Sequence, residues 1–431
     1  MIFRAWLNRW RQNSALTSAT DSGSTTKSRL LIYGINYAPE VTGVGRYTGE
    51  LAAAMAEQGH KVEVVTSPPH YPGWYARPPY SAARYRSEEI GGIRVIRCPI
   101  WLRGAARGIW RLIAPLSFAV SSAPVIFWRL IASRPDTLLC VEPTLLGAPF
   151  ALLVAKLLRV KTVLHVQDLE VDAAFAVGHI SLKERFRGWA FAVEGWLLRR
   201  FDRIVTISPH MADALAAKGV SRDRLTLIRN WVYLDRIQPL ERPSIYRSEL
   251  GLADDDFVAL YSGQIGLKQA LEVMLEAAKL LTDEPRIKFV VAGEGPLKDA
   301  LIAKYGGLPN VRFLPLQSEA RLCEFLNLAD CHILPQAASI RDLVLPSKLG
   351  GMLASGKAIL ATADPGTELY DFLAGTATLV PAGESQAIAT RLKEAVNGGL
   401  PHQPEKTLAL AQSLSAERLL VDFEKVLTET A

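Results

Sequence analysis

Short apolar runs alternate with stretches of helical periodicity along most of the chain. The runs are rich in Val, Ile and Leu, and the stretches between them repeat apolar residues every three or four positions. This alternation is typical of parallel sheets whose strands are joined by crossover helices. In the first half it predicts strands at 30–35, 61–66, 93–97, 137–141, 162–166 and 203–207. In the second half it predicts strands at 257–261, 288–291, 311–314, 331–334 and 358–361.

The alternation lapses at 230–243, which we interpret as a Pro-containing connector. A chain of 431 residues is also too long for one ordinary domain. We therefore expect an α/β protein with two Rossmann-like domains, at 29–235 and 236–431, that face each other across a cleft. The last helix is free to cross back to the first domain. Doubly wound sheets bind ligands beyond the carboxyl ends of their strands, so function is expected in the loops that follow the predicted strands.

Residues 1–28 precede the first domain as a basic amphipathic leader and a Ser/Thr-rich linker. As a helix, the leader would place these apolar residues on one side: Ile2, Phe3, Trp6, Leu7 and Trp10. The pattern fits a short interfacial anchor, and it fits a disordered leader equally well. Further on, the longest apolar tract, at 109–128, contains Arg111, Pro115 and Pro124, which we expect to interrupt it. The sequence thus predicts docking on a membrane and not crossing it.

Charge is distributed unevenly. Residues 1–230 hold 30 Lys and Arg against 17 Asp and Glu, a net charge of +13, whereas the remainder holds 19 against 26, a net charge of −7. The basic half suits anionic lipid headgroups or diphosphates, and a scattered solvated surface is the alternative. No basic motif with interleaved aromatics suggests nucleic acid. We expect a cytoplasmic protein, peripheral on the inner face of the membrane.

The four cysteines form no CxxC pair and no regular framework, which argues against a disulfide scaffold and favours a reducing compartment. No second histidine at ligand spacing and no DxD-type pair supports a metal site. We therefore expect no metal and no cofactor.

A turn with two glycines follows the first predicted strand. Gly43 and Gly45 would let backbone amides approach an anion just before a helix that we expect at Tyr47, and we assign both glycines to the binding of a phosphate-bearing donor. A purely structural turn stays open as the alternative. A nicotinamide dehydrogenase is disfavoured, because the second strand ends at Thr66 without the carboxylate that would hold the ribose.

The strand at 162–166 leads into an acidic cluster. His165 and Asp168 lie where this strand is expected to meet the cleft, so either side chain could position an acceptor hydroxyl or take its proton. A lone strand histidine is more often a core residue. The acidic residues that follow favour the functional interpretation.

A second glycine turn follows the first strand of the second half. Gly263 and Gly266 would clear space for phosphate, and Lys268 would supply a cation for the charge that grows on a departing diphosphate. After the next strand, Glu294 stands in a tight turn where a base or ribose could lie.

Near position 346 the chain reads Pro-Ser-Lys at the predicted start of a helix that closes at 355–356. Its free amides and the Lys348 ammonium would hold a second side of the same diphosphate, with Ser347 as a donor or as a simple helix cap. Cations and helix ends that recur at several strand ends favour one shared ligand.

Taken together, the motifs resemble glycosyltransferase family 4, the retaining enzymes of GT-B fold. The resemblance covers about 29–395 and is carried by these segments: 33–40 with Thr42 and Gly43, 67–72, 165–168, 206–208, 230–231, 261–263 with Gly266, Lys268 and Gln269, and 345–348. It implies a nucleotide-sugar donor on the second domain and an acceptor on the first. The implied acceptor is a polyprenyl-diphosphate-linked oligosaccharide for exopolysaccharide assembly. GDP-fucose is the favoured donor, ahead of GDP-mannose and UDP-hexoses.

The sequence departs from the family at two places. Gln264 stands where many members carry an arginine on the donor diphosphate, so Lys268 and Lys348 would neutralise most of the charge. The family's paired glutamates fall on Leu343 and Gly351, and Asp342 or Glu368 is the candidate replacement. Two alternatives therefore stay open: a GT-B nucleotide-sugar epimerase, which needs no acceptor, and a non-catalytic nucleotide-binding scaffold.

Overall fold

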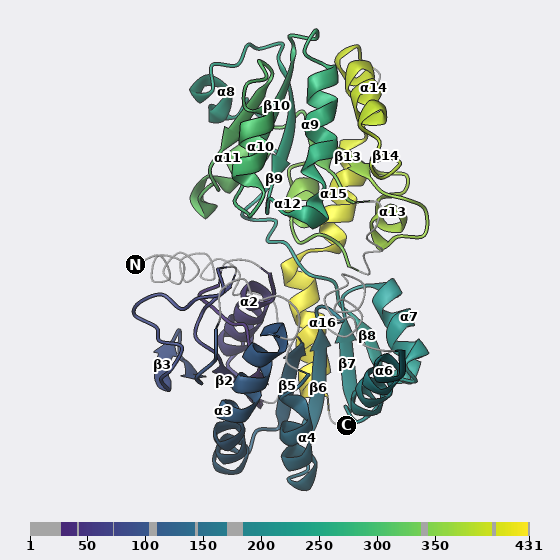
Figure 1. The fold of residues 1–431 in the computed structure, drawn as a ribbon. Helices are drawn as coiled ribbons and strands as arrows, with labels where there is room; N and C mark the ends of the chain where they lie inside the picture. Colours follow the sequence, from purple (N-terminus) through teal and green to yellow (C-terminus); the bar gives the residue numbers. More distant parts are fainter. Residues whose placement is uncertain are drawn as a thin grey trace. The chain divides into compact units, whose positions relative to one another are not determined.

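The computed structural model describes residues 27–40, 43–71, 73–102, 110–142, 145–169, 184–337, 344–398 and 402–429. Almost all of the leader predicted at 1–28 lies outside the described residues. The chain forms two compact units (Figure 1). Unit 1 comprises the described residues up to Ile228 together with those from Leu420 onward, and unit 2 comprises Arg229–Leu419.

Unit 1 contains an eight-stranded sheet in the order β3-β4-β2-β1-β5-β6-β7-β8. Its strands are β1 Arg29–Tyr33, β2 Lys61–Thr66, β3 Arg86–Ile90, β4 Ile93–Arg97, β5 Thr137–Glu142, β6 Lys161–Val166, β7 Arg203–Thr206 and β8 Leu225–Leu227. Neighbouring strands are parallel except β3 and β4. The six predicted strands are confirmed. The pattern missed β3 because it is polar and largely exposed, and β8 because it has only three residues.

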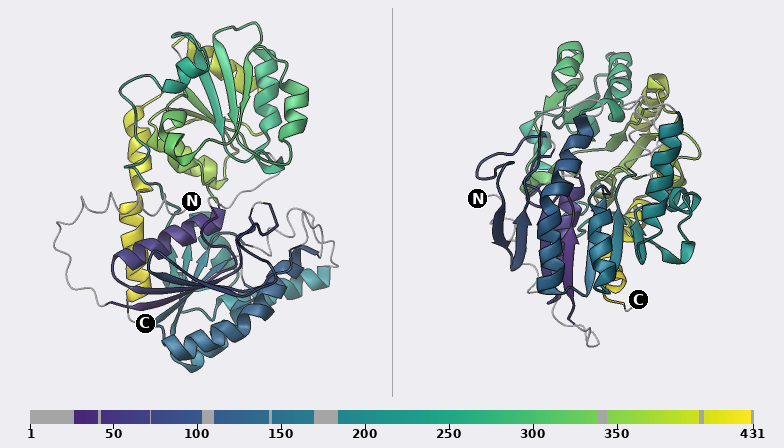
Figure 2. Two further views of the ribbon diagram at one scale, coloured as in Figure 1. Left: turned by 90° about the vertical axis from the view of Figure 1, so that its left-hand side faces the viewer. Right: turned by 60° about the horizontal axis from the view of Figure 1, so that its bottom comes forward.

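Helices cover both faces of this sheet. They are α2 Gly43–Glu57, α3 Trp110–Ser133, α4 Ala148–Leu157, α6 Glu184–Leu198, α7 Pro209–Ala217 and the part of α16 (Ala416–Thr428) from Leu420 onward, with a short helical turn, η2, at Arg222–Arg224. In the left view of Figure 2, α3 and α4 lie on the opposite face of the sheet from α2 and α16. The contacts agree, since the Tyr33 hydroxyl bonds Ser122 Oγ of α3 at 2.7 Å and the His165 ring meets the Phe423 ring of α16 with centroids 4.9 Å apart.

The prolines of the long apolar tract lie inside α3, a continuous helix of 24 residues, so the expected interruption was wrong. An interior proline costs one helical hydrogen bond. Packing offsets that cost, because α3 buries Phe118, Ile126 and Leu130 against the sheet. Within the described residues, one helix, the Ile113–Ser133 part of α3, is long and apolar enough to span a membrane. Only 22% of its most apolar 18-residue stretch is buried inside the protein.

The end of the chain is fastened to unit 1 by α16. The Thr137 hydroxyl donates to the Leu427 carbonyl at 2.8 Å, and Lys161 Nζ donates to the Val426 carbonyl at 2.7 Å. These bonds satisfy carbonyls in the last turn of α16, which have no partner within the helix. The first residues of α16, up to Leu419, are part of unit 2, and the rest of the helix is part of unit 1.

Unit 2 is built around a six-stranded, fully parallel sheet in the order β11-β10-β9-β12-β13-β14. Its strands are β9 Phe257–Ser262, β10 Ile287–Ala292, β11 Val311–Leu314, β12 Cys331–Leu334, β13 Ala358–Thr362 and β14 Thr378–Val380. Its helices are α8 Ile245–Glu249, α9 Leu271–Leu280, α10 Lys298–Tyr305, α11 Leu322–Leu326, α12 Leu349–Ala354, α13 Glu368–Leu373, α14 Ser385–Val396 and α15 Pro404–Ser413, with short turns η3 Leu267–Gln269 and η4 Glu319–Arg321. All five strands predicted for this half are confirmed, and the pattern missed β14, which has only three residues.

Each sheet reverses its strand order at one place. In unit 1 the chain runs from β1 to β2 in one direction and later from β5 to β6 in the other, and in unit 2 the same reversal lies between β9 and β12. Connections on opposite sides of a reversal leave an open crevice at the carboxyl ends of the strands, where ligands of such sheets bind. The candidate site therefore lies in the loops after β9 and β12, and a second set of functional loops follows β1 and β5.

Candidate functional site

Two glycine turns cross at the carboxyl end of the unit 2 sheet. The turn after β9 and the turn after β10 are joined by backbone bonds from Gly263 N to the Ala292 carbonyl and from Ile265 N to the Glu294 carbonyl, at 3.0 and 2.9 Å. A Cβ on Gly293 would lie 1.7 Å from the Gly263 carbonyl oxygen. The φ angles of Gly263 and Gly293, +148° and +151°, also favour glycine. Only glycine lets the two turns approach this closely.

Lys348 lies directly against the turn after β9. Its Cδ is 3.1 Å from where a Cβ on Gly263 would stand, and its Nζ is 3.7 Å from the centroid of the Tyr261 ring. The ammonium nitrogen is buried, and among the residues that the structure describes it has no hydrogen-bond partner. Burial lowers the pKa of Lys348 well below its usual value. The Tyr261 ring thus holds the Lys348 side chain at the Gly263 turn, and no carboxylate of the described chain pairs with it.

Lys268 stands on the same turn, in η3, and its side chain is exposed. Its carbonyl accepts the Ala337 N–H at 3.4 Å, so the loop after β12 touches the turn after β9. Gln264 is exposed, and its carbonyl accepts the Tyr261 hydroxyl. A Cβ on Gly266 would lie 3.0 Å from the Gln269 side-chain oxygen. The predicted residues Gly263, Gln264, Gly266, Lys268 and Lys348 therefore all lie on the loops after β9 and β12.

The remaining predicted donor residues are less enclosed. Helix α12 begins at Leu349, with Lys348 at its N-cap and no side-chain capping bond, so Ser347 precedes the helix and is exposed. Glu294 is exposed and accepts a bond from Lys298 Nζ at 2.7 Å, which lowers the pKa of this carboxyl. Ser347 and Glu294 therefore lie at the solvent-exposed rim of the loops.

In unit 1 the two glycines of the first turn lie inside helix α2. This helix begins at Gly43 and not near Tyr47, as the sequence suggested. A Cβ on Gly45 would lie 2.4 Å from Glu40 Oε2. The anion that Gly45 accommodates is therefore the protein's own carboxylate.

Glu40 was missed by the sequence analysis. Its buried carboxylate accepts hydrogen bonds from Asn36 Nδ2 at 2.9 Å and from the backbone amides of His70 and Tyr71 at 3.0 Å each. It therefore ties the loop after β1 to the loop after β2. The available signal was a single acid in a Pro-containing loop, five residues before Gly45 of the following helix.

His165 and Asp168 are placed differently from each other. His165 is buried, and Gln167 Nε2 donates to its Nε2 at 3.0 Å, while its Nδ1 has no partner among the described residues. Burial lowers the pKa of His165 to about 3, so the ring is neutral near pH 7. Asp168 is exposed at the end of the same stretch. The structure thus presents Asp168 to solvent and packs His165 against α16.

The positions of the family's paired glutamates are also partly visible. A Cβ on Gly351 would meet Leu326 and Ile237 side-chain carbons at 3.1 and 3.4 Å, so its surroundings are apolar. Glu368, one of the two suggested replacements, is buried and forms an ion pair with Arg229. The other replacement, Asp342, and the first position, Leu343, lie outside the described residues.

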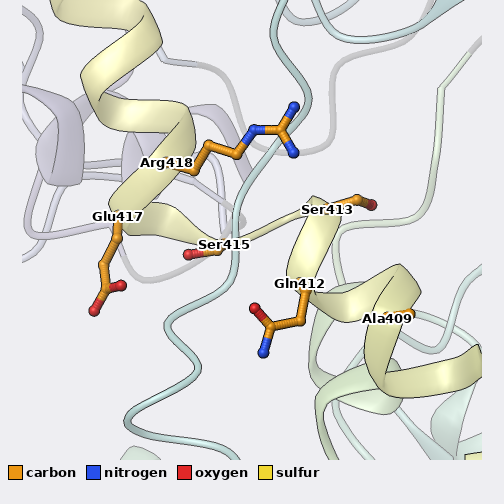
Figure 3. Close-up of a pocket in the computed structure, with 6 residues that line it drawn as sticks. All are labelled: Ala409, Gln412, Ser413, Ser415, Glu417 and Arg418. Carbon is orange, nitrogen blue, oxygen red and sulfur yellow. The ribbon is translucent and has the colours of Figure 1, made fainter. Parts of the chain in front are cut away.

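Two further features bear on ligands. Among the described residues, no group of three or more His, Cys, Asp and Glu side chains is arranged to hold a metal ion. A pocket lies where α15 leads into α16, and Figure 3 shows its lining: Ala409, Gln412, Ser413, Ser415, Glu417 and Arg418. It contains none of the predicted site residues.

Comparisons with known proteins agree with this fold. The family described as "Glycosyl transferase 4-like domain" matches residues 42–231, and the family described as "Glycosyl transferases group 1" matches residues 244–409. The chain is 40% identical over 383 residues to the colanic acid biosynthesis glycosyl transferase WcaI of Escherichia coli, which covers 85% of this chain and 92% of that protein.

Solved structures share the fold at low identity. Sucrose-phosphate synthase from Thermosynechococcus elongatus superposes with a TM-score of 0.69 at 15% identity, covering 93% of this chain and 98% of its own. HepE from Anabaena, solved with UDP and glucose, superposes with a TM-score of 0.65 at 14% identity, covering 93% and 99%. The two doubly wound units, both domain matches and the full-length relative show that this chain is a glycosyltransferase of family 4, with the GT-B fold.

Proposed function

We propose that this enzyme is a retaining transferase that moves a sugar from a nucleotide-diphosphate donor onto a lipid-linked oligosaccharide during exopolysaccharide biosynthesis. The observation that carries the proposal is Lys348. Its buried ammonium lies at a glycine turn on the switch point of unit 2 without an anionic partner in the described chain. A diphosphate that lost its sugar there would supply the missing charge, and a desolvated cation stabilises such charge far more than an exposed one.

The other donor contacts follow from the same loops. The glycines at 263 and 266 carry no side chains that would cover a ligand, although the Gly263 N–H is itself bonded to the Ala292 carbonyl. Lys268 extends from the same turn into solvent. Lys348 would then act as a fixed cation and Lys268 as a mobile one. Gln264 would add hydrogen bonds but no charge, with Ser347 and Glu294 at the rim.

The identity of the donor is inferred from the relatives. The name of the E. coli relative refers to colanic acid, and HepE was solved with UDP and glucose. We favour GDP-fucose on the family resemblance alone, with GDP-mannose and UDP-hexoses, the class that the HepE complex represents, as the next candidates. We see no need for a metal ion in this scheme, because the two lysines carry the charge of the leaving group.

The acceptor is assigned to unit 1. The loop held by Glu40 follows β1, next to the switch point with β5, and leads into α2, whose first turn contains Gly43 and Gly45. We assign Asp168 to position an acceptor hydroxyl, with the neutral His165 behind it as a positioning group through Gln167. A polyprenyl-diphosphate acceptor requires that this unit work at the cytoplasmic face of the membrane, where the net charge of residues 1–230, +13, suits anionic lipid.

The proposal is tested by replacing Lys268. We expect Lys268→Ala to lose most sugar transfer in a radiolabelled assay while its circular dichroism spectrum is unchanged, because a cation for the leaving group is lost. Lys279→Ala, an exposed lysine on α9, is the matched control and should retain activity. Full activity of Lys268→Ala would refute the assignment.

The same assay separates the alternatives. Conversion of the donor in the absence of acceptor would identify an epimerase. Nucleotide binding, seen as a rise in melting temperature, without transfer or hydrolysis would identify a scaffold.

A further inference from the structure

Helix α3 is apolar on both of its faces. The residues of its inner face are spaced four apart and are buried against the sheet: Ala114, Phe118, Ser122, Ile126 and Leu130. Its outer face also consists of large apolar side chains: Leu116, Val120, Phe127, Trp128 and Ile131. A helix that covers a sheet in water normally has a polar outer face. Packing within unit 1 explains the inner face of α3 and leaves the outer face unexplained.

The neighbouring helix α4 repeats this arrangement. It buries Ala151, Leu152 and Ala155, and it exposes Phe150, Leu153 and Leu157. The Phe127 and Phe150 rings lie 6.4 Å apart, so the two outer faces are continuous, and Figure 1 shows α3 and α4 side by side. We call this surface the α3–α4 face; its members, each 39–75% exposed, are Leu116, Val120, Phe127, Trp128, Ile131, Leu146, Phe150, Leu153, Leu157 and Leu158. Soluble monomers rarely expose so many large apolar side chains together.

The charges of the same segments are all positive. Residues 90–135 contain seven Arg and no Asp or Glu, and residues 143–167 contain three Lys and Arg and no Asp or Glu. Arg134, Lys156 and Arg159 are exposed at or just beyond the ends of the two helices. Neither helix contains Asp or Glu, although Lys156 is paired with Asp202 and Arg129 with Glu63. An apolar surface with cations at its edge and no acid on either helix complements an anionic leaflet, with its apolar interior and negative headgroups.

The fastening of α3 excludes a crossing helix. The Ile113–Ser133 segment spans about 31 Å at 1.5 Å per residue, enough for a bilayer core. Its inner face, however, holds buried contacts with the sheet, including the bond between Tyr33 and Ser122, and the Tyr85 hydroxyl donates to the Ser121 carbonyl at 2.8 Å. Crossing would strip these contacts from unit 1. The helix can therefore only lie along the surface.

We infer that the α3–α4 face inserts into one leaflet of an anionic membrane, so that unit 1 is a monotopic membrane domain. Trp128 and the two phenylalanines enter the region between headgroups and acyl chains, where aromatic rings are favoured. Arg134 and Arg159, at the helix ends, pair with phosphate, whereas Lys156 already has Asp202 as a partner. The inference extends the proposed function, because it specifies how the enzyme reaches a lipid-linked acceptor, but binding to the membrane needs neither donor nor acceptor.

The test uses the full chain and vesicles without acceptor. We expect the protein to float with phosphatidylcholine vesicles that contain 30% phosphatidylglycerol, and the doubly substituted Val120→Glu, Leu153→Glu protein to bind them at least tenfold more weakly. Both positions are more than half exposed, so the substitutions should not disturb folding. The control pair Leu280→Glu, Ile302→Glu, exposed apolar residues of unit 2, should bind like the native protein. Trp128→Ala is a milder second variant and should weaken binding several-fold.

Three results would overturn the inference. One is native-like vesicle binding by the doubly substituted protein, and another is no binding by the native protein. The third is a native dimer, seen by light scattering, that the substitutions convert to monomer while vesicle binding stays unchanged, because the face would then pack on a second copy. Nucleotide-induced stabilisation of the same variants keeps the two proposals separate. Loss of vesicle binding with intact nucleotide binding concerns only the α3–α4 face, and the reverse result concerns only the donor site.

Discussion

Replacing Lys348 by methionine should stabilise the ligand-free protein and abolish donor binding. The native ammonium is buried without a hydrogen bond in the described chain. An unsatisfied buried polar group costs about 1–3 kcal/mol. The contact with the Tyr261 ring returns about 1 kcal/mol of this. A methionine fills the same space and makes favourable sulfur contacts with the ring. We expect a net gain of about 1 kcal/mol, which raises the melting temperature of a domain of this size by about 2–4 °C.

The pH dependence gives an internal check. The folded-state pKa of Lys348 lies below the unfolded value, so between the two the unfolded chain binds more protons and native stability rises with pH. The penalty is full below the folded pKa and vanishes above about 10.5, the unfolded value. The advantage of Lys348→Met over the native protein should therefore grow as the pH falls below about 10.5 and vanish above it.

The assay is thermal unfolding followed by circular dichroism, with and without nucleotide. The native protein should gain about 2.7 kcal/mol at a nucleotide concentration one hundred times Kd, and Lys348→Met should gain almost nothing. Lys279→Met, at an exposed position on α9, should change neither quantity. A Lys348→Met protein that melts below the native protein and still responds to nucleotide would refute the reasoning, because the lysine would then be a structural group with a partner.

Three further predictions concern the backbone and a buried histidine. Gly293→Ala should lower the free energy of unfolding by more than about 2 kcal/mol, because the new Cβ would stand 1.7 Å from a carbonyl oxygen of the neighbouring turn, whereas Gly307→Ala, where no atom lies within 4 Å, should be nearly neutral in urea titrations. Gly45→Ala should likewise destabilise the protein, since the new Cβ would clash with the buried Glu40 carboxylate, which is fixed by three hydrogen bonds. Gly188→Ala, on a helix where no atom lies within 4 Å of the new Cβ, should stabilise the protein by up to about 1 kcal/mol. Equal melting temperatures for the two alanine variants would count against this explanation of Gly45. His165→Asn should reduce the loss of stability at acid pH. The folded pKa of His165, about 3, lies below the usual 6.5, so between these values the unfolded chain binds a proton first and the native protein loses up to about 1.4 kcal/mol per pH unit. Urea midpoints measured at pH 7 and 4.5 should show that this loss is absent in the variant.

The sequence by itself determined the two sheets and most of the loops that matter. Strands buried on both faces must be apolar, so their positions are written in the hydrophobic pattern, and parallel order follows from the helices between them. Glycines, prolines and lysines after those strands indicated the turn at Gly263 and the segment at Lys348. The strands that escaped, β3, β8 and β14, are exposed or only three residues long and therefore leave no such pattern.

Only the tertiary structure decided what each of those residues touches. Local spacing cannot show that Gly45 is required by the protein's own Glu40, or that Lys348 is buried over Tyr261 while Lys268 is exposed, because these contacts join segments far apart in the chain. The apolar tract at 109–128 is the clearest case. Its composition was evident, but whether it would break at its prolines, cross a membrane or cover a sheet depended on the buried contacts of one helical face, which exist only once the sheet has formed.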